Sequence, residues 1–376
     1  MKLKKILKKI VYWLFRIALL FGIFLILVVN FYPSFGGNPN KESMNKMKSV
    51  PNYKDGKFSN IEKVKEDFSW DDYKKMFGKM IKGNPNRKPN KSLPVLKWNK
   101  SELEALKKEE TTAVWYGHST FFLKMNGKNI LIDPMFGDYP APVPYIINKR
   151  FIDTLPIAIA DLPTIDVILL SHDHYDHLDY GSIKKLKNKT KQFIVPLGVG
   201  GHLEKWGVPK SKITELYWHE SIKVDDIVFT ATPAQHFSGR GLRDKMATLW
   251  SSWVITGQHN IFFSGDSGYF NGFKEIGEKY GPFDVCMMEC GQYDELWADI
   301  HMFPEQTVQA HIDVKGDMLI PIHWGGFALA THDWDGPIKR LSKVSKEKNI
   351  NLATPIIGEK IIIGGNQQFS DWWKDK

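Results

Sequence analysis

The chain has 376 residues, 43% hydrophobic and 25% charged, a composition and length that fit a globular catalytic domain with an attached module and exclude a small disulfide-held scaffold. Of the net charge of +9, residues 1–40 carry six basic and no acidic groups, residues 41–100 carry sixteen basic and seven acidic groups, and residues 101–376 are left with −6. The acidic C-terminal part argues against a nucleic-acid cleft, and the basic N-terminal part indicates a segment facing an anionic surface.

Residues 10–32 are predicted to form a transmembrane anchor. Between Ile10 and Phe31 only Arg16 is charged, and a helix of this length spans about 33 Å, enough to cross a bilayer core. Residues 1–9 contain five lysines and are predicted to stay in the cytoplasm, which places the rest of the chain outside it. A cleaved signal peptide is the alternative, but the bulky residues after the apolar run favour an uncleaved anchor.

Residues 33–100 are predicted to be a basic juxtamembrane linker that contains one amphipathic helix. Residues 36–60 are rich in Gly, Asn, Ser and Lys, as linkers are. The helix begins after the capping residue Ser69, and its apolar residues recur at helical spacing: Trp70, Tyr73, Met76, Phe77, Met80 and Ile81. This apolar stripe either lies on a lipid surface or packs on the catalytic domain, and both interpretations stay open.

Residues 101–376 are predicted to form the catalytic domain. From Thr111 onward, short β-branched runs end in Gly, Asp, Pro or His, as in "NILIDP", "DVILLSH", "NIFFSGD" and "DMLIPIH". Helical stretches such as "NGFKEIGEKYG" lie between them, which predicts an α/β or α+β layered fold. Cys286 and Cys290 lie in one predicted strand, about 13 Å apart, which is too far for a disulfide.

The segment "SHDHYDHLD" predicts a metal site. It places His172, His174, Asp176 and His177 directly after the apolar strand "DVILL". Residues 172 and 174 can face one metal ion while residues 176 and 177 turn to a second. Imidazole nitrogens and carboxylate oxygens suit zinc, and iron or manganese also accept them.

Three further residues are predicted to complete this site. His236, Asp266 and His323 each follow an apolar strand, in "TATPAQH", "FFSGD" and "LIPIH". They are expected to project from the same sheet edge as His172 and to complete the coordination of two metal ions.

"SHDHYDHLD" resembles the metal motif of the metallo-β-lactamase superfamily, whose fold is an αββα sandwich. From about Val114 to Ala330 the chain more narrowly resembles the N-acyl-phosphatidylethanolamine-hydrolysing phospholipase D branch, through "VWYGHSTFFL", "HFSGRG", "HMFPE" and "IHWGGF". The departures are Gly326, where threonine is expected, and Cys290, where an aliphatic residue is expected. The resemblance implies two zinc ions: one bound by His172, His174 and His236, the other by Asp176, His177 and His323, with Asp266 bridging them.

The resemblance also implies a function, that of a zinc-dependent phospholipase D-type phosphodiesterase acting on N-acyl-phosphatidylethanolamine or a related glycerophospholipid. Asp176 and Asp266 are expected to orient the attacking hydroxide. His301 is the candidate to contact the substrate or protonate the leaving group, because an imidazole exchanges protons near neutral pH; capping the following helix is its alternative role. The expected partners are the phospholipid substrate and an anionic membrane surface, without nucleic acid, and a homodimer is allowed for.

The roles of several other side chains are left open or expected to be minor. His118 is expected to donate a hydrogen bond to a metal ligand. Arg240 and Arg243 either grip a phosphate or pair with Asp244 or Glu289. Five histidines are expected at the surface, without a role at the site: His202, His219, His259, His311 and His332.

Three other functions compete with the phospholipase. A metal-dependent lactonase or esterase has a similar dinuclear site. A nuclease with "HxHxDH" is disfavoured by the acidic charge of residues 101–376. A non-catalytic binding protein is disfavoured by the complete ligand set.

Overall fold

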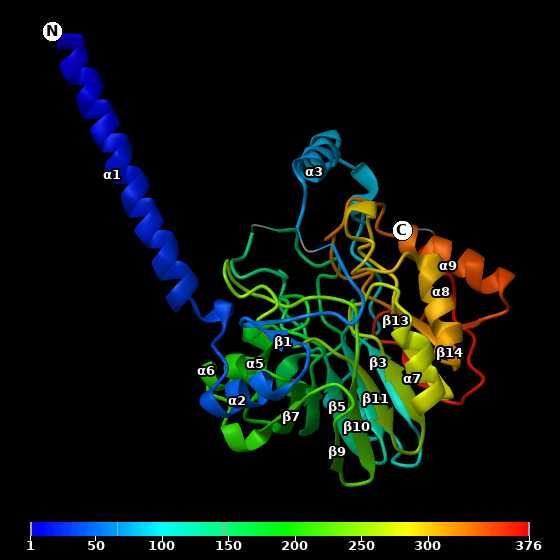
Figure 1. The fold of residues 1–376 in the computed structure, drawn as a ribbon. Helices are drawn as coiled ribbons and strands as arrows, with labels where there is room; N and C mark the ends of the chain where they lie inside the picture. The colour runs from blue at the N-terminus through cyan, green and yellow to red at the C-terminus, as the bar shows by residue number, and fades with distance from the viewer. Residues whose placement is uncertain (1, 66, 146, 375–376) are drawn as a thin grey trace.

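Two seven-stranded sheets packed face to face form the body of the molecule (Figure 1). The structure, a computed structural model, describes residues 2–65, 67–145 and 147–374. The first sheet has the following strands in spatial order: β16 (Lys360–Ile362), β3 (Thr112–Trp115), β4 (Phe121–Met125), β5 (Lys128–Ile132), β6 (Ile165–Leu169), β7 (Thr190–Pro196) and β8 (Ile213–Leu216). The second sheet has these: β15 (Asn351–Leu352), β14 (Gly316–Ile322), β13 (Phe283–Glu289), β12 (Asn260–Phe263), β11 (Ser252–Thr256), β10 (Ile227–Thr232) and β9 (Ser221–Val224).

Helices cover the outer face of each sheet. Ile183 and Leu186 of α5 (Tyr180–Leu186) and Leu203 of α6 (Gly200–Lys205) pack on the first sheet. The second sheet is covered by α7 (Gly272–Tyr280), α8 (Pro304–Asp313) and α9 (Gly336–Glu347). The predicted αββα sandwich is therefore confirmed, and the strands predicted from the apolar runs are present.

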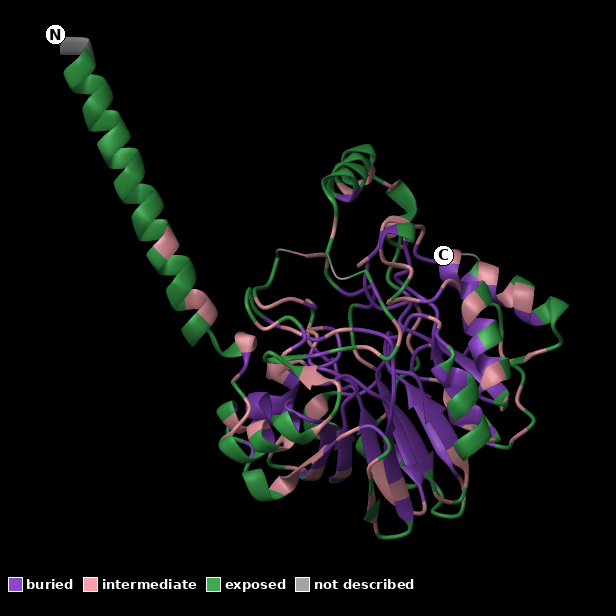
Figure 2. Cartoon of the chain, in the orientation of Figure 1, coloured by how far each residue is buried: buried purple, intermediate pink, exposed green. Residues whose placement is uncertain are grey.

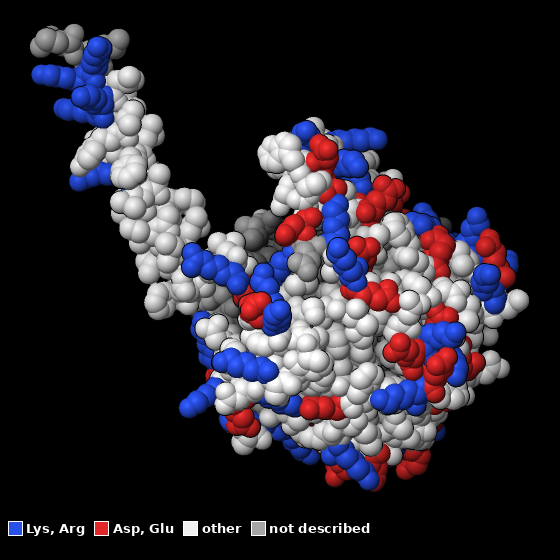
Figure 3. Space-filling view, viewed as in Figure 1, with Lys and Arg blue, Asp and Glu red and all other residues white. Residues whose placement is uncertain are grey.

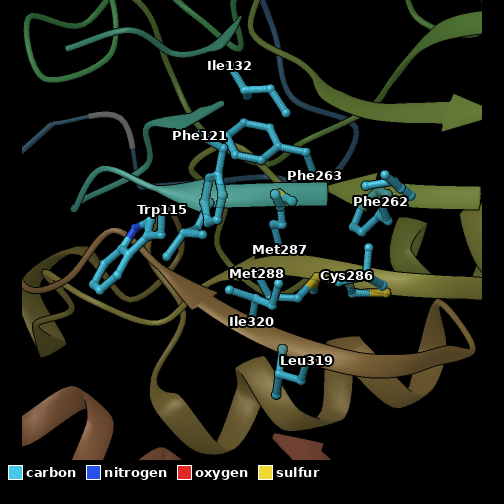
Figure 4. Close-up of a cluster of buried hydrophobic side chains, with 14 of the residues drawn as sticks. Trp115, Phe121, Ile132, Phe262, Phe263, Cys286, Met287, Met288, Leu319 and Ile320 are labelled. Carbon is cyan, nitrogen blue, oxygen red and sulfur yellow. The ribbon is translucent and has the colours of Figure 1, made fainter. Parts of the chain in front are cut away.

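The core lies between the sheets because the strands alternate their apolar side chains. In β6, Val167 and Leu169 point into the space between the sheets, while Ile168 points to the helix side. Figure 4 shows Phe121 and Ile132 of the first sheet near Phe263 and Met287 of the second. Both faces of the central strands are buried, which explains their nearly continuous apolar sequences.

The strand directions bring several strand ends to one edge of the sandwich. Strands β5 to β8 pair in parallel, as do β12 to β15. β10 and β3 are each separated from the nearest parallel strand by one antiparallel neighbour, so they run in the same direction as that set. The carboxyl ends of all these strands therefore meet at the same edge.

The N-terminal helix α1 (Lys2–Phe31) projects from the body with its apolar side chains exposed (Figures 1 and 2). Its segment Lys4–Phe31 is long and apolar enough to cross a membrane. The predicted anchor over residues 10–32 thus coincides with the greater part of one continuous helix, which also includes the basic end.

The linker predicted over residues 36–60 is instead folded onto the body. It forms α2 (Lys41–Ser49) and a hairpin of β1 (Tyr53–Lys54) and β2 (Lys57–Phe58). Met47 and Phe58 are buried in a small apolar cluster with Trp250. The polar composition misled the prediction because the segment is held by few apolar side chains and by many polar contacts to the body, such as those of Lys46 with Glu220 and of Asn60 with the His236 backbone. The predicted amphipathic helix is present as α3 (Trp70–Lys82), and α4 (Lys100–Glu104) precedes the first sheet.

Candidate metal centre

The predicted ligands meet at the edge where the carboxyl ends of the strands gather. The loop after β6 supplies the first four, and the remaining three follow β10, β12 and β14: His172, His174, Asp176, His177, His236, Asp266 and His323. All are buried except His174, which is partly buried. The prediction that these seven residues lie together is confirmed, although they are spread over 152 positions of the sequence, from His172 to His323.

Three imidazoles and one carboxylate form the first group of donors. The Nδ1 atom of His174 lies 2.9 Å from Nε2 of His172 and 3.2 Å from Nε2 of His236. The Oδ2 atom of Asp266 lies 3.8 Å from Nε2 of both His172 and His236. The four donor atoms lie within 4.8 Å of one another, close enough to hold a single ion.

The second group lies on the other side of Asp266. Nε2 of His323 is 3.1 Å from Oδ2 of Asp176, and Nε2 of His177 is 3.6 Å from the same oxygen. Oδ2 of Asp266 is 3.1 Å from Nε2 of both His177 and His323. Asp266 thus faces both groups, the position expected of a bridging ligand.

The electrostatics of the donors fit divalent cations. Burial lowers the pKa of His172 and His236 well below the ordinary value, so both imidazoles are neutral, the form that binds a metal. Burial alone would also lower the pKa of His323, but the surrounding carboxylates, Asp266 first, raise it to about 10. Oδ1 of Asp266 is buried and has no hydrogen-bond partner among the described residues. The carboxylates of the site therefore favour positive charge, and Oδ1 of Asp266 is available as a further metal ligand. Imidazole nitrogens and carboxylate oxygens are ligands that zinc accepts.

Two residues orient ligands from behind. Nε2 of His118 lies 2.9 Å from Oδ2 of Asp176, the hydrogen bond to a metal ligand expected for His118. Asp133, at the end of β5, accepts a hydrogen bond from Nδ1 of His177 at 2.7 Å and from the Ser171 amide at 2.7 Å. A carboxylate behind a histidine ligand fixes the ring and its tautomer. Asp133 was not predicted, although "LIDP" ends a strand just as the ligand motifs do.

His301 lies beside the donors and is oriented by Glu289. Its ring is stacked on that of His323, with centroids 5.2 Å apart, and it lies 5.0 Å from that of His236. The fully buried Glu289 carboxylate is 2.8 Å from Nδ1 of His301 and 3.4 Å from Nδ1 of His323. From the sequence, Glu289 was considered only as a partner for arginine. Its proximity to two histidines could not be predicted, because it depends on the path of the loop between β13 and α8.

Backbone strain accompanies the site. His118, Asp133 and His323 have φ values of 55°, 42° and 65°, in the left-handed region that non-glycine residues rarely adopt. Gly326, the departure from the family pattern, leaves room for its neighbours, because a Cβ there would lie 2.6 Å from Cβ of His118. The close approach of these segments explains why no larger residue stands at position 326.

Arg240 and Arg243 do not reach a phosphate position at the donors. Arg240 is buried and donates to the carbonyls of Ser34, at 2.9 and 2.7 Å, and Leu178, at 2.8 Å, so it ties the N-terminal segment to the metal-binding loop. Its amide, rather than its guanidinium, bonds to Asp244. Arg243 is exposed, in a groove beside the end of α1.

Two histidines expected at the surface are buried. His202 lies 3.2 Å from Asp173, a carboxylate of "SHDHYDHLD" that turns away from the donors and accepts hydrogen bonds from Gly239 and Thr248. His311 is buried on α8. Neither follows a strand, so their positions depended on packing between elements distant in sequence. Cys286 and Cys290 are buried and unbridged, as expected.

A mainly apolar pocket opens beside the donors and encloses about 180 Å³. Its walls include His236 and residues of three segments distant in sequence: Val64, Phe68, Tyr73, Phe237, Met246 and Trp297. One side of the pocket is thus continuous with the first group of donors, and the opposite side is formed by the N-terminal segment and α3.

Comparison with known proteins agrees with this geometry. Residues 128–324, just over half of the chain, match a sequence family described as Beta-lactamase superfamily domain. An uncharacterised protein of Mycobacterium tuberculosis is 37% identical over 331 residues, which cover 86% of this chain and 87% of that protein. N-acyl-phosphatidylethanolamine-hydrolysing phospholipase D 1 of Caenorhabditis elegans is 35% identical over 235 residues, 59% of this chain and 66% of that protein.

Among solved structures, a metallo hydrolase of the archaeon Ignicoccus hospitalis matches with a TM-score of 0.51 and 19% identity, covering 67% of this chain and 97% of that one. This likeness concerns the fold. The sandwich and the two donor groups at its edge define a metal-dependent hydrolase. The chain belongs to the metallo-β-lactamase superfamily, and within it to the branch that resembles N-acyl-phosphatidylethanolamine-hydrolysing phospholipase D.

Proposed function

We propose that the protein is a membrane-anchored dinuclear zinc phosphodiesterase of the phospholipase D type, acting on N-acyl-phosphatidylethanolamine or a related glycerophospholipid. The observation that carries the proposal is the position of Asp266 between two complete donor groups, with an apolar pocket beside them. The similarity to a phospholipase D of this specificity supports the substrate class.

Two zinc ions would be held by the seven predicted ligands. When bound, such a pair lowers the pKa of a water molecule and polarises a phosphoryl oxygen. Asp176 and Asp266 would fix the direction from which water approaches phosphorus. In the reaction, the water oxygen forms a bond to phosphorus, the bond from phosphorus to the head-group oxygen breaks, and the products are phosphatidic acid and the free N-acylethanolamine.

His301 would supply the proton that the leaving alcohol needs. Its Nδ1 is engaged by Glu289 at 2.8 Å, and Nε2 forms no hydrogen bond to the described part of the chain. With Nδ1 held in this way, Nε2 accepts a proton in the neutral ring and donates it in the cationic ring. The capping role considered for His301 belongs instead to Gln306, whose side chain accepts from the Phe303 amide.

The lipid nature of the substrate is supported by the surroundings of the donors. The pocket beside His236 is lined mostly by apolar side chains, which can hold an acyl chain while the phosphate lies at the donors. Helix α1 would keep the enzyme on the membrane that contains the substrate, with residues 1–9 in the cytoplasm and the catalytic domain outside it.

The test combines metal content with turnover on the full chain in detergent micelles, using phospholipids with and without an N-acyl group. We expect about two zinc ions per chain and release of the N-acylethanolamine, with both lost in Asp176→Asn and His236→Ala. Two zinc ions with opening of lactones or esters and no phosphodiester cleavage would overturn the phospholipase and leave the metal centre intact. Salt-sensitive RNA binding with RNA cleavage would point to the nuclease instead.

A further inference from the structure

We propose that α3 is an interfacial helix that docks the catalytic domain on an anionic bilayer, with the opening of the apolar pocket facing the lipid. This proposal deepens the proposed function, which supplies the reason for the domain to dock on lipid. Its test measures docking and does not require turnover. The occupant of the apolar face is the surface of the membrane that α1 enters.

The apolar side of α3 is turned away from the domain. Trp70, Phe77, Met80 and Ile81 have relative exposures of 75%, 58%, 62% and 84%. Figure 2 shows the helix standing clear of the body with nearly all of its surface exposed. The interpretation in which this stripe packs on the catalytic domain is therefore wrong. An exposed aromatic and aliphatic stripe of this kind marks a surface that something covers.

Polar contacts hold α3 in this orientation. The buried Asp72 closes a capping box with Ser69 and pairs with Lys65 at 2.5 Å, while Lys79 pairs with Asp294 at 2.6 Å. After the helix, Asn84 donates to the Thr331 carbonyl at 3.0 Å. The domain thus grips the polar side at several points, and the helix is positioned rather than loosely attached.

The joint between α1 and the domain brings the domain close to the bilayer. Directly after α1, the carbonyl of Pro33 accepts from Trp206 at 2.7 Å, the carbonyl of Ser34 accepts from Arg240, and the Gly37 amide donates to His202 at 3.0 Å. No flexible spacer separates the span from the domain, so the face around the end of α1 must lie against the membrane. Helix α3 stands on that side of the body (Figure 1).

The charges on this side suit anionic lipid. Lysine side chains lie around α3, interspersed with acidic ones (Figure 3). Within α3, Lys75 and Lys82 are exposed and form no ion pair with the residues that the structure describes. Near the end of α1, the exposed Arg243 and Leu242, the latter 85% exposed, line one groove with Ile26. Basic side chains beside an apolar stripe are typical of helices in the headgroup region.

The pocket connects this face to the chemistry. Tyr73 of α3 lines the same pocket as His236, together with Phe68 just before the helix. A lipid that leaves the bilayer beside α3 would therefore reach the donors through a mainly apolar pocket, whose lining also includes Lys65, Asp67, Lys245 and Asp299. Docking would orient the site, whereas α1 alone would only tether it.

The test measures membrane depth at α3 in the full chain reconstituted in vesicles. Cys286 and Cys290 are both fully buried, so a spin label on Met80→Cys reports a single site. In vesicles of phosphatidylcholine and phosphatidylglycerol we expect the label to be accessible to oxygen and shielded from a water-soluble nickel chelate. The same label on Ile312→Cys, an exposed apolar position of α8, should remain accessible to the chelate.

Two matched comparisons separate the parts of the proposal. Two lysines near an anionic surface favour the docked state of α3 about 30-fold more on an anionic bilayer than on a neutral one. In the Lys75→Gln/Lys82→Gln variant this difference between the two bilayers should disappear. Phe77→Asp/Ile81→Asp, at exposed positions that leave the fold intact, should return the label at position 80 to water. A label at Met80→Cys as accessible to the chelate as one at Ile312→Cys would overturn the proposal. Strong coupling between labels in dilute vesicles would overturn it too, because a second copy of the chain would then cover α3. Loss of phosphodiesterase activity alone would bear only on the proposed function.

Discussion

Replacing Glu289 by glutamine tests whether this buried carboxylate orients both His301 and His323. Its Oε1 faces Nδ1 of both histidines, and its Oε2 accepts from the Met302 amide at 3.1 Å and, more weakly, from the Ser267 amide. A glutamine can keep only one side of this arrangement. Whichever way its amide turns, an NH₂ group faces donors.

The expected loss follows from the shortest contact. A hydrogen bond to a charged group contributes about 1.5–3 kcal/mol. At about 1.4 kcal/mol per factor of ten, its loss lowers zinc affinity or turnover roughly 10- to 150-fold. Replacing residues that support metal ligands costs about 10- to 100-fold in metal affinity or activity. The two ranges agree. The longer contact of Glu289 with His323, at 3.4 Å, adds little to the loss expected from the contact with His301.

The assay measures zinc affinity by competition with a chelator and phosphodiester turnover on the same preparation. Glu305→Gln is the matched control, since Glu305 is an exposed carboxylate that pairs with Arg340 at the surface. It should change neither quantity by more than about twofold. If Glu289→Gln retained both zinc affinity and turnover at the level of Glu305→Gln, the assigned role of Glu289 would be refuted.

Three further predictions concern metal, proton transfer and pH. Removing metal with a chelator should abolish turnover and lower Tm, with both restored by zinc; an apoprotein of unchanged Tm would contradict the metal centre. His301→Gln should lower kcat about 100-fold or more while the zinc content stays at two per chain, and a wild-type kcat would exclude His301 as the proton donor. Burial lowers the pKa of His311 to about 4, and a hydrogen bond with the backbone of Asp317 opposes this shift only in part. The folded state therefore binds fewer protons, so stability is complete above about pH 6.5 and falls as the pH drops toward 4. His311→Leu should escape a loss of about 2 kcal/mol at pH 5, measured as the difference in Tm between variant and wild type, and parallel Tm curves from pH 7 to 5 would disprove it.

Local sequence determined much of this protein. The apolar runs identified the strands, and each ligand was found because it followed such a run. Ligands such as His172 and Asp266 could be grouped because parallel strands end at a common edge, which is a property of the sheet and not of the individual residues. The apolar composition of residues 10–32 was likewise enough to identify a helix able to span a membrane.

Only the tertiary structure decided which polar groups meet across distant segments. Glu289 lies against two histidines because β13 and β14 are neighbours. His202 is buried because its two ring nitrogens contact Asp173 and the Gly37 amide, which are far apart in the sequence. The apolar stripe of α3 was visible in the sequence, but its direction depended on ion pairs to Lys65 and Asp294, made by charged side chains whose partners no periodicity specifies. Hydrophobic patterns are local and repeat along the chain, whereas a polar contact is one pairing between two distant atoms. The sequence alone therefore specified the sheets and the predicted metal ligands, and the folded chain specified what orients them.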